Sequence, residues 1–253
     1  MSESFEHLHT RITRTTVPDV LKVIGAAIAE RRLTTLSYYG FHTANVLRKS
    51  AAARRAFEQL TMVFPDGIAI LWSAPLFGRR LTIENRINGD VLGPSLFDRA
   101  RRAGWRIFLL GGDHAIVEAA VARLAELFPG VCFAGFHHGY ARGKEAEAVI
   151  DEIRRSSADI VLVGMGQPHQ EHWIEENAKA LGTSVVMGVG GYFDHLARRA
   201  DCYPPVISRL RLNWAYRLWI EPRRLWKRYV FGFPLYLMHL VAYAAGAGRS
   251  RVT

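Results

Sequence analysis

Asp66 lies between two short apolar segments of the sequence. In Phe64-Pro65-Asp66-Gly67 the aspartate follows a strand-like segment and precedes Ile68–Trp72. An aspartate that faces a cleft at the end of a strand can act as a general base. The same residue type is also a favourable N-cap for the helix that follows. Spacing alone favours the N-cap, so both roles stay open for Asp66 at this point.

Glycine ends three of the apolar runs. The glycine-containing ends are Gly111-Gly112, Gly164-Met165-Gly166 and Gly188-Val189-Gly190-Gly191. Glycine lets a backbone approach a phosphate closely, and a helix N-terminus that follows offers free N–H groups. None of the three ends matches the complete dinucleotide fingerprint. Taken together they predict a ligand of the nucleotide type.

The sequence offers poor metal ligands. It has no Asp-x-Asp pair, which could hold a divalent cation on a diphosphate. The tandem His137-His138, and His169 with His172, are not accompanied by the carboxylate motif of zinc hydrolases. We therefore expect no metal ion. Diphosphate charge would instead be met by helix N-termini and by planar guanidinium groups. Candidate guanidinium groups are those of Arg86, Arg217, Arg223, Arg224 and Arg228.

The elements that must position these residues alternate along the chain to about residue 190. The apolar runs predict strands at Leu36–Phe41, Met62–Phe64, Arg106–Leu110, Val131–Phe136, Asp159–Gly164 and Ser184–Gly188. Amphipathic stretches predict helices at Ile116–Leu127, Lys144–Arg155 and His169–Leu181. Runs that are apolar almost throughout indicate strands covered on both faces. We therefore predict an α/β fold, a Rossmann-like parallel sheet flanked by helices, with ligands at the carboxyl ends of the strands.

The character of the chain changes after residue 195. We expect an α/β catalytic domain over 1–195 and an Arg- and Trp-rich helical appendage over 196–253. Glu221-Pro222 should end one helix of this appendage and begin the next. The nearly apolar stretch Tyr229–Gly248 reaches the lower length limit of a membrane span. Its Pro234 and His239 favour a helix that lies in the membrane interface, and the alternative is a helix packed on the protein core.

Composition points to an anionic partner. The 253 residues carry a formal charge of +10, and nine basic residues against two acidic ones lie between residues 198 and 228. Such an excess suits an anionic membrane, a phosphorylated substrate or nucleic acid, and the apolar tail favours the membrane. Cys132 and Cys202 are too few for a disulfide framework. The first sixteen residues have no apolar core of a signal peptide, so we expect a cytoplasmic protein.

Six segments together resemble the WecG/TagA/CpsF glycosyltransferase family, over about residues 18–230. They are PDGIAI (65–70), FLLGG (108–112), HHGY (137–140), VGMGQPHQEHWI (163–174), GVGGYFDHLA (188–197) and NWAYRLWIEPRRLWKRY (213–229). Their order and spacing make the resemblance specific, whereas no single segment does.

The resemblance implies an inverting transferase that takes a hexose or N-acetylhexosamine from a UDP-sugar, of the UDP-N-acetylmannosamine or UDP-glucose type. The acceptor would be a glycan carried on polyprenyl diphosphate, in exopolysaccharide or cell-surface glycan biosynthesis. It also implies that neither a metal nor a cofactor is needed. The enzyme would associate peripherally with the inner face of the cell membrane.

The resemblance also implies roles for individual residues. Asp66 matches the catalytic base, Arg86 and Gln170 match polar residues of the active site, and Thr43 and Asn45 lie at the first strand-to-helix junction. The arginines of the appendage would approach the diphosphates. The other expected substrate-binding residues are Gly111, Gly112, Gly139, Gly166, Glu171, Gly191, Asp194, Arg217 and Arg224.

The chain departs from the family pattern in four places. Gly40 stands where the family has Asn, and after Arg86 the family's Gly-x-Asp becomes Gly89-Asp90-Val91. Cys202–Val206 replaces Arg-Ala-Pro-x-Trp, and Arg211–Trp214 replaces Gly-Leu-Glu-Trp. These differences bear on the identity of the sugar and of the acceptor more than on the fold.

Two other classes of function fit parts of the sequence. A nicotinamide-dependent oxidoreductase would share the α/β pattern and the glycine turns, but the fingerprint and its acidic ribose-binding residue are missing. A non-enzymatic basic protein could bind a membrane, or nucleic acid, through residues 198–228, but it would leave the polar residues at the strand ends unexplained. We expect no nucleic-acid partner. Self-association and the pathway stay open.

Overall fold

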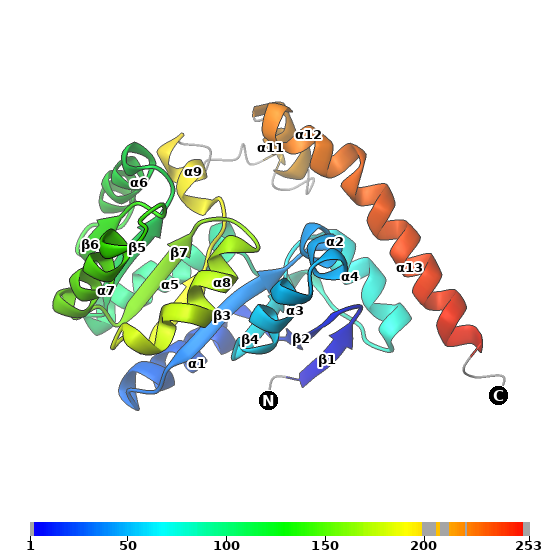
Figure 1. Cartoon of the computed structure of the whole chain (residues 1–253), viewed down its shortest axis with the longest axis horizontal. Helices are drawn as coiled ribbons and strands as arrows, with labels where there is room; N and C mark the ends of the chain where they lie inside the picture. Colours follow the sequence, from blue (N-terminus) through cyan, green and yellow to red (C-terminus); the bar gives the residue numbers. More distant parts are fainter. Residues whose placement is uncertain (1–2, 199–205, 208–212, 221, 250–253) are drawn as a thin grey trace.

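The computed structural model describes residues 3–198, 206–207, 213–220 and 222–249. Its centre is a six-stranded sheet flanked by helices (Figure 1). The strands are β3 (Thr34–Tyr39), β4 (Met62–Pro65), β5 (Arg106–Gly111), β6 (Cys132–His137), β7 (Ile160–Gly164) and β8 (Val185–Gly188). Their spatial order is β4-β3-β8-β7-β5-β6, and every neighbouring pair is parallel. The predicted parallel α/β sheet is confirmed.

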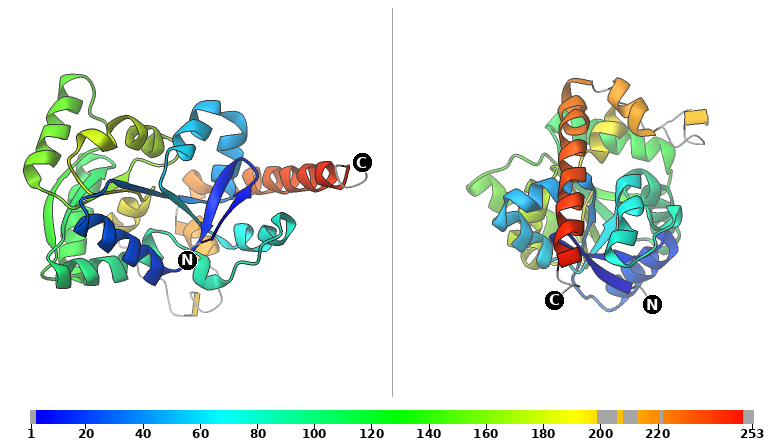
Figure 2. Two further views of the ribbon diagram at one scale, coloured as in Figure 1. Left: turned by 90° about the horizontal axis from the view of Figure 1, so that it is seen from below. Right: turned by 90° about the vertical axis from the view of Figure 1, so that its right-hand side faces the viewer.

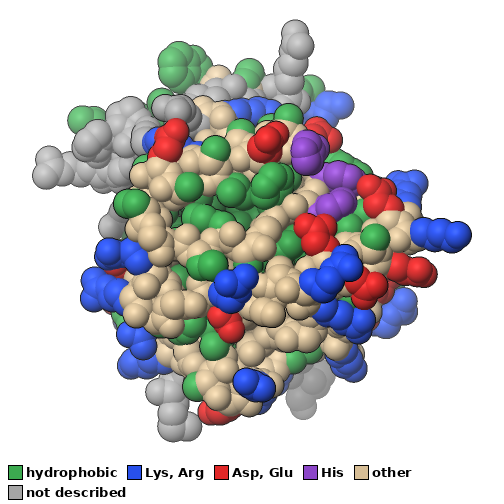
Figure 3. All heavy atoms as spheres, turned by 90° about the vertical axis from the view of Figure 1, so that its left-hand side faces the viewer, with side chains coloured by type: hydrophobic (Ala, Val, Ile, Leu, Met, Phe, Trp, Pro, Cys, Tyr) green, Lys and Arg blue, Asp and Glu red, His purple; other side chains and the backbone are tan. Residues whose placement is uncertain are grey.

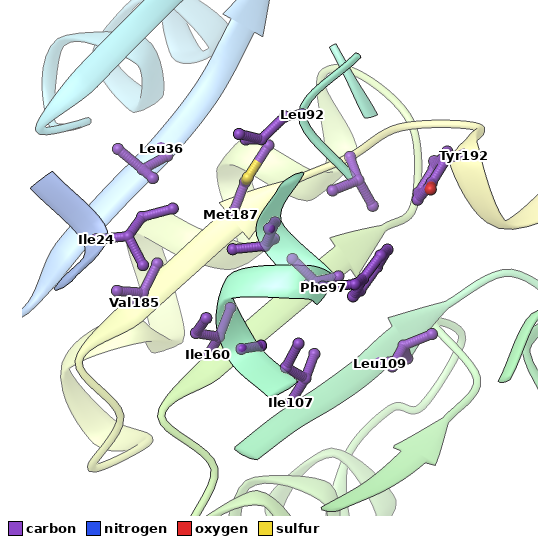
Figure 4. Close-up of a cluster of buried hydrophobic side chains, with 14 of the residues drawn as sticks. Ile24, Leu36, Leu92, Phe97, Ile107, Leu109, Ile160, Val185, Met187 and Tyr192 are labelled. Carbon is purple, nitrogen blue, oxygen red and sulfur yellow. The ribbon is translucent and has the colours of Figure 1, made fainter. Parts of the chain in front are cut away.

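Side chains alternate between the two faces of this sheet, as the pleat of a strand requires. In β5, Ile107 and Leu109 enter one core, and Phe108 and Leu110 enter the other. Both faces are buried under helices, which explains why the strand sequences are apolar at almost every position. Figure 4 shows the first of these cores, where strand side chains meet residues such as Ile24 and Phe97 from the covering helices.

The helices divide between the two faces. One face is covered by α1 (Val17–Ala29), α5 (Gly89–Ala103), α6 (His114–Leu127) and α9 (Tyr192–Ala197). The other is covered by α2 (Phe41–Lys49), α3 (Ala51–Glu58), α7 (Lys144–Ser156) and α8 (His169–Asn177). Shorter helical segments are α4 (Ile68–Ser73), η1 (Ala74–Phe77), η2 (Ile83–Asn85) and η3 (Ala178–Ala180). The expected boundary between residues 195 and 196 falls within α9, and the division into two domains stays a prediction.

An antiparallel hairpin precedes the sheet and was not predicted. It consists of β1 (Glu3–His7) and β2 (Thr10–Arg14). Phe5 and Ile12, which are paired across the hairpin, are buried and join the second core. The imidazole of His7 is buried too, with Tyr39 Oη at 3.2 Å from Nδ1 and Ser73 Oγ at 2.8 Å from Nε2.

The C-terminal part of the chain is helical, as expected. It contains α11 (Asn213–Ile220), α12 (Pro222–Val230), which begins at the expected proline, and α13 (Gly232–Arg249). The helix α13 runs alongside the α/β unit (Figures 1 and 2) and contacts α2. Tyr236, 1% exposed, packs inward, and its hydroxyl lies 2.6 Å from Ser73 Oγ.

The outward side of α13 is apolar and open. Met238 and Val241 are 66% and 69% exposed. By length and composition, the stretch Leu225–Gly246 is long and apolar enough to cross a membrane, with a mean hydropathy of 1.3, and 17% of it is buried. One side of the helix packs on the protein, as one of the two alternatives predicts, and a position of the other side in the membrane interface stays a prediction.

Candidate active site at the strand ends

Asp66 lies directly after β4, and its carboxylate is oriented by another loop. Gly67 is the N-cap of α4 and has φ +84°, a conformation that favours glycine, so the helix begins one residue after the carboxylate. The Nδ2 amide of Asn88 donates a hydrogen bond to Asp66 Oδ1 at 3.0 Å. The competing role of Asp66 as the helix N-cap is therefore not the one that the structure gives it.

Asp66 faces a small polar pocket. Seven side chains line this pocket, those of Tyr38, Asp66, Asn88, Asp90, Val189, Tyr192 and His195. Gly89 and Gly191, the N-cap of α9, complete it. The cavity measures about 40 Å³, whereas sites that enclose a small-molecule ligand measure roughly 300–1,000 Å³. The pocket can hold a reacting group, and the rest of a nucleotide ligand would lie outside it along the strand ends.

A second carboxylate enters the polar pocket beside a histidine. Asp90 Oδ1 lies 3.4 Å from Nδ1 of His195, whose side chain is buried. Asp90 belongs to the Gly89-Asp90-Val91 sequence, where the carboxylate is displaced by one position from the family pattern. Gly40, another departure, faces Asp66: a Cβ on it would lie 3.9 Å from Asp66 Oδ2. Of these two departures from the family pattern, Asp90 lines the polar pocket and Gly40 lies next to Asp66.

Behind the pocket, a buried network joins the ends of β3, β7 and β8. Glu171 Oε1 accepts hydrogen bonds from Ser37 Oγ at 2.6 Å and from Gln170 Nε2 at 2.7 Å. Gln170 Oε1 accepts one from the backbone N–H of Gly190 at 2.8 Å. Burial raises the pKa of Glu171 to about 7, although these donors favour the ionised carboxylate. The side chains of Gln170 and Glu171 are 0% exposed, so in this structure they support the strand ends from beneath.

Thr43 belongs to the same network. Its hydroxyl donates to Gln167 Oε1 at 2.5 Å and accepts from the backbone N–H of Gly40 at 3.1 Å. Gln167 in turn donates from Nε2 to the carbonyl of Tyr38 at 2.6 Å. The predicted Thr43 therefore fixes the junction between β3 and α2 from inside.

The predicted glycines shape the strand ends around this network. Gly139 N–H donates to the carbonyl of Gly112 at 3.0 Å, and a Cβ on Gly139 would lie 3.0 Å from Cα of Gly111. Gly112 N–H donates to the carbonyl of Gly164 at 3.1 Å. These backbones approach so closely that no side chain fits between them. Gly166, with φ +76°, faces open space.

Arg86 lines a second, apolar pocket. Six side chains form its walls, those of Phe41, Ile68, Ala69, Trp72, Tyr229 and Phe233. Gly67 and Arg86 complete the lining, and the cavity measures about 310 Å³. The Nε of Arg86 is buried and has no hydrogen-bond partner among the described residues. Arg86 was expected in the active site. The structure places it in the pocket that Gly67 lines, whereas Asp66, the residue before Gly67, lines the polar pocket.

The remaining predicted residues lie further from the polar pocket. Asn45 Nδ2 donates to the carbonyl of Gly232 at 2.6 Å, so it joins α2 to the start of α13. Asp194 is on α9, with its carboxylate 3.9 Å from Arg198. Arg217 and Arg224 are on α11 and α12, and their side chains lie outside the described part of the structure.

Comparison with known proteins gives this geometry a context. The sequence profile described as "Glycosyl transferase WecG/TagA/CpsF family" matches residues 5–250. The chain belongs to this glycosyltransferase family. The match includes most of the hairpin, the strand ends and the described helices α11, α12 and α13, so it takes in the apolar pocket as well as Asp66.

Three relatives illustrate the similarity within the WecG/TagA/CpsF family. Each is named N-acetylglucosaminyldiphosphoundecaprenol N-acetyl-beta-D-mannosaminyltransferase. The protein of Bacillus spizizenii is 31% identical over 76% of this chain and 72% of its own length. That of Bacillus subtilis is 32% identical over 70% of this chain, and that of Staphylococcus aureus 32% over 68%. The matched regions span 66% and 64% of the lengths of these last two proteins.

The sequence analysis did not predict several of the residues that line the polar pocket. Asn88 was inside a segment noted for Arg86, and an Asn directly before Gly89-Asp90 is a recognisable helix N-cap signal. Tyr38 and His195 carry no such signal, because an aromatic residue in a strand and a histidine in a helix are ordinary core residues.

The described residues contain one cluster with the residue types of a metal site. His137, His138 and Glu145 have ligand atoms within 4.8 Å of one another. Hydrogen bonds already use His138, whose Nδ1 accepts from Tyr140 N–H at 3.2 Å and whose Nε2 lies 3.2 Å from Glu145. Nδ1 of His137 lies 2.9 Å from the carbonyl of His138. The cluster is explained by these hydrogen bonds, and independence from metals stays a prediction.

Proposed function

We propose that this chain is an inverting, metal-independent glycosyltransferase that moves a hexose or N-acetylhexosamine from a UDP-sugar to a polyprenyl-diphosphate-linked acceptor. The names of the relatives support the acceptor class and make N-acetylmannosamine the first sugar to test. The observation that carries the proposal is the Asp66 carboxylate, held by Asn88 in a pocket at the strand ends.

In the proposed reaction Asp66 takes the proton of an acceptor hydroxyl. The hydroxyl oxygen forms a bond to the anomeric carbon while the bond from that carbon to the UDP oxygen breaks. Attack from the face opposite UDP inverts the configuration, and the electron pair of the broken bond leaves on UDP. Asp90 lies in the same pocket and can accept hydrogen bonds from hydroxyls of a bound sugar.

The charge of the leaving diphosphate needs donors, which the chain can supply without a metal. Backbone N–H groups at the glycine-rich ends of β5, β7 and β8 are one source, apart from those of Gly112 and Gly190, which donate within the protein. Arg217 and Arg224 are the proposed guanidinium donors to this leaving diphosphate, since a planar fork suits a phosphate.

We further propose that the enzyme works at the inner face of the cell membrane, in exopolysaccharide or cell-surface glycan synthesis. The outward apolar side chains of α13 support membrane contact. A lipid-linked acceptor would be reached there. The face over α6, β6 and α7 instead mixes basic and acidic side chains (Figure 3), which does not favour a nucleic-acid scaffold on that side.

A donor and acceptor panel tests the function. The full chain is incubated with a short-tailed GlcNAc diphosphate lipid and with UDP-ManNAc, UDP-GlcNAc, UDP-glucose, UDP-glucuronate or GDP-mannose, with and without EDTA. We expect selective transfer from one UDP-sugar, insensitive to EDTA, with an inverted anomeric configuration by NMR. Loss of transfer in EDTA, or retention of configuration, would refute the mechanism. Titration with NAD(P)H without a fluorescence change would set aside the oxidoreductase alternative.

A further inference from the structure

The apolar pocket has one arginine, Arg86, in its lining, and a second, Arg228, against the ring of the lining Phe41. Phe41 is part of its wall, and the centroid of its ring lies 5.6 Å from that of Tyr229 and 5.7 Å from that of Phe233. The Arg228 guanidinium lies over the Phe41 ring at 5.5 Å. The Nε atoms of Arg86 and Arg228 are both buried and lack hydrogen-bond partners among the described residues. Buried donors of this kind are costly unless a ligand satisfies them.

The pocket is next to the site of the proposed chemistry. Asp66 lines the polar pocket and Gly67 lines the apolar one. Consecutive Cα atoms are about 3.8 Å apart, so a single molecule can enter both pockets at this step. Asp66 and Arg86 also come from neighbouring segments, because Ile87 N–H donates to the carbonyl of Pro65 at 2.9 Å.

The apolar pocket also adjoins the exposed apolar side of the protein. Trp72 is part of its wall and is nevertheless 76% exposed. Leu76, one turn further along the same apolar segment, and Val230, next to the lining Tyr229, are exposed as well. An apolar chain that leaves the pocket could therefore contact these exposed apolar side chains.

We propose that the apolar pocket binds the first isoprenoid units of the lipid acceptor, with the acceptor's diphosphate at Arg86 and Arg228. This deepens the proposed function and rests on it. An amphiphile with an anionic head and an apolar chain matches both features of the pocket, since guanidinium groups pair with phosphates and the walls bury hydrocarbon. A soluble nucleotide would leave the apolar walls empty.

The first test uses the unmodified chain. Acceptors with the same GlcNAc diphosphate head and a C1, C5, C10 or C15 isoprenoid or alkyl tail are compared at a fixed concentration of the active donor. We expect KM for the acceptor to fall at least about tenfold from C1 to C15, because each buried CH₂ contributes to binding. Transfer with a KM independent of tail length would overturn the pocket proposal alone. Absence of transfer to every acceptor would instead overturn the proposed function.

A binding measurement without turnover makes the second test. Calorimetry should show that C15 isoprenyl diphosphate binds at least about tenfold more tightly than inorganic diphosphate or the C15 alcohol. Ala69→Phe fills the pocket and should remove this advantage of the lipid diphosphate, whereas Val241→Phe on the outer side of α13 should keep it. Equal binding of inorganic diphosphate, or equal loss in both variants, would refute the assignment.

Discussion

Nδ2 of Asn88 donates a hydrogen bond to Asp66 Oδ1 at 3.0 Å, while Oδ1 of the same amide accepts one from the Val91 N–H at 3.1 Å. One side chain therefore caps α5 and orients the proposed base. The start of a helix that covers the sheet is tied to the position of a carboxylate 22 residues earlier in the chain. Fold stability and chemistry can be separated at this residue by choice of substitution.

Asn88→Asp is expected to damage the reaction without damaging the fold. Aspartate caps a helix as well as asparagine does, but it cannot donate to Asp66 and places a like charge beside it. The loss of a hydrogen bond to a charged group predicts a fall in kcat/KM of about 10–100-fold. Asn88→Ala should also lower the free energy of unfolding by about 1 kcal/mol, because it removes the cap. An Asn88→Asp enzyme with wild-type kinetics would show that the hydrogen bond is irrelevant to catalysis.

Asp66→Asn should abolish most turnover and spare the donor site. The amide cannot take a proton from the acceptor, so we expect kcat to fall by about 10²–10⁴-fold. Its Oδ1 can still accept from Asn88, so thermal stability should hold. Donor affinity, measured by calorimetry in the absence of acceptor, should change little. Full activity of this variant would exclude Asp66 as the base.

Gly40→Asn is expected to alter sugar selection. Position 40 is the N-cap of α2, with φ −122° and ψ 179°, and asparagine is a preferred residue there. Its side chain would extend toward Asp66 Oδ2 and restore the residue type of the family pattern. We expect the ratio of kcat/KM between two UDP-sugars to change by about tenfold or more, since the new amide adds a donor and acceptor to the pocket. Gly40→Ala, which makes only ordinary contacts, is the control.

Glu171 predicts a loss of stability at higher pH. Burial raises its folded-state pKa to about 7 from its ordinary value of 4.5, so the protonated form of Glu171 is favoured in the fold. The contribution of protonated Glu171 to folding stability is complete below about pH 4.5 and is lost as pH rises through about 7. The difference between the two pKa values corresponds to about 3 kcal/mol. Glu171→Gln should therefore gain thermal stability relative to the wild type between pH 5 and pH 8.

The matched control for this experiment is Glu176→Gln, the same chemical change at an exposed position of α8. It should leave the pH dependence of the melting temperature unchanged. A wild-type and a Glu171→Gln protein with parallel melting curves across this range would contradict the protonation of Glu171.

The burial of His7 predicts the opposite pH dependence, a loss of stability at lower pH. Burial lowers its pKa to about 3 from 6.5, so the neutral ring is favoured in the fold. The stability is complete above about pH 6.5 and is lost as pH falls toward 3. At pH 5 the loss would be about 2 kcal/mol. His7→Gln should flatten the fall in melting temperature between pH 7 and pH 5, whereas exposed His114→Gln should not. Equal slopes in all three proteins would refute the assignment.

The parts of the fold that sequence could predict are those with local signals. Ile107–Leu110 and their counterparts in β7 and β8 are apolar at every position because both faces are covered, and the strands were found to within a few residues. The hairpin was not predicted, because the hydrogen-bond partners of its buried His7 are Tyr39 and Ser73, which are 32 and 66 residues away. No local pattern reports such partners.

The same distinction applies to the site. Asp66 became a candidate because strand, turn and carboxylate are adjacent in sequence, and the resemblance to the family, not the spacing, favoured it as the base, a role that stays a prediction. Glu171 was expected to contact substrate, and this stays a prediction; in the structure its carboxylate is buried and accepts from Ser37, 134 residues earlier. Its place beneath the strand ends follows from the sheet order, which puts β8 between β3 and β7.

Asp66 and Gly67 are consecutive residues that line different pockets, and this has a consequence for the length of the acceptor glycan. If the lipid and its diphosphate are fixed on one side of this peptide and the base on the other, the span between phosphate and reacting hydroxyl is set by covalent geometry. The enzyme would then select acceptors by the distance from diphosphate to reacting hydroxyl. In a glycan with one more sugar between the two, the hydroxyl would lie beyond Asp66, so this longer glycan would not react even if its terminal sugar were the same. Chain growth would stop after one addition, without any separate terminator.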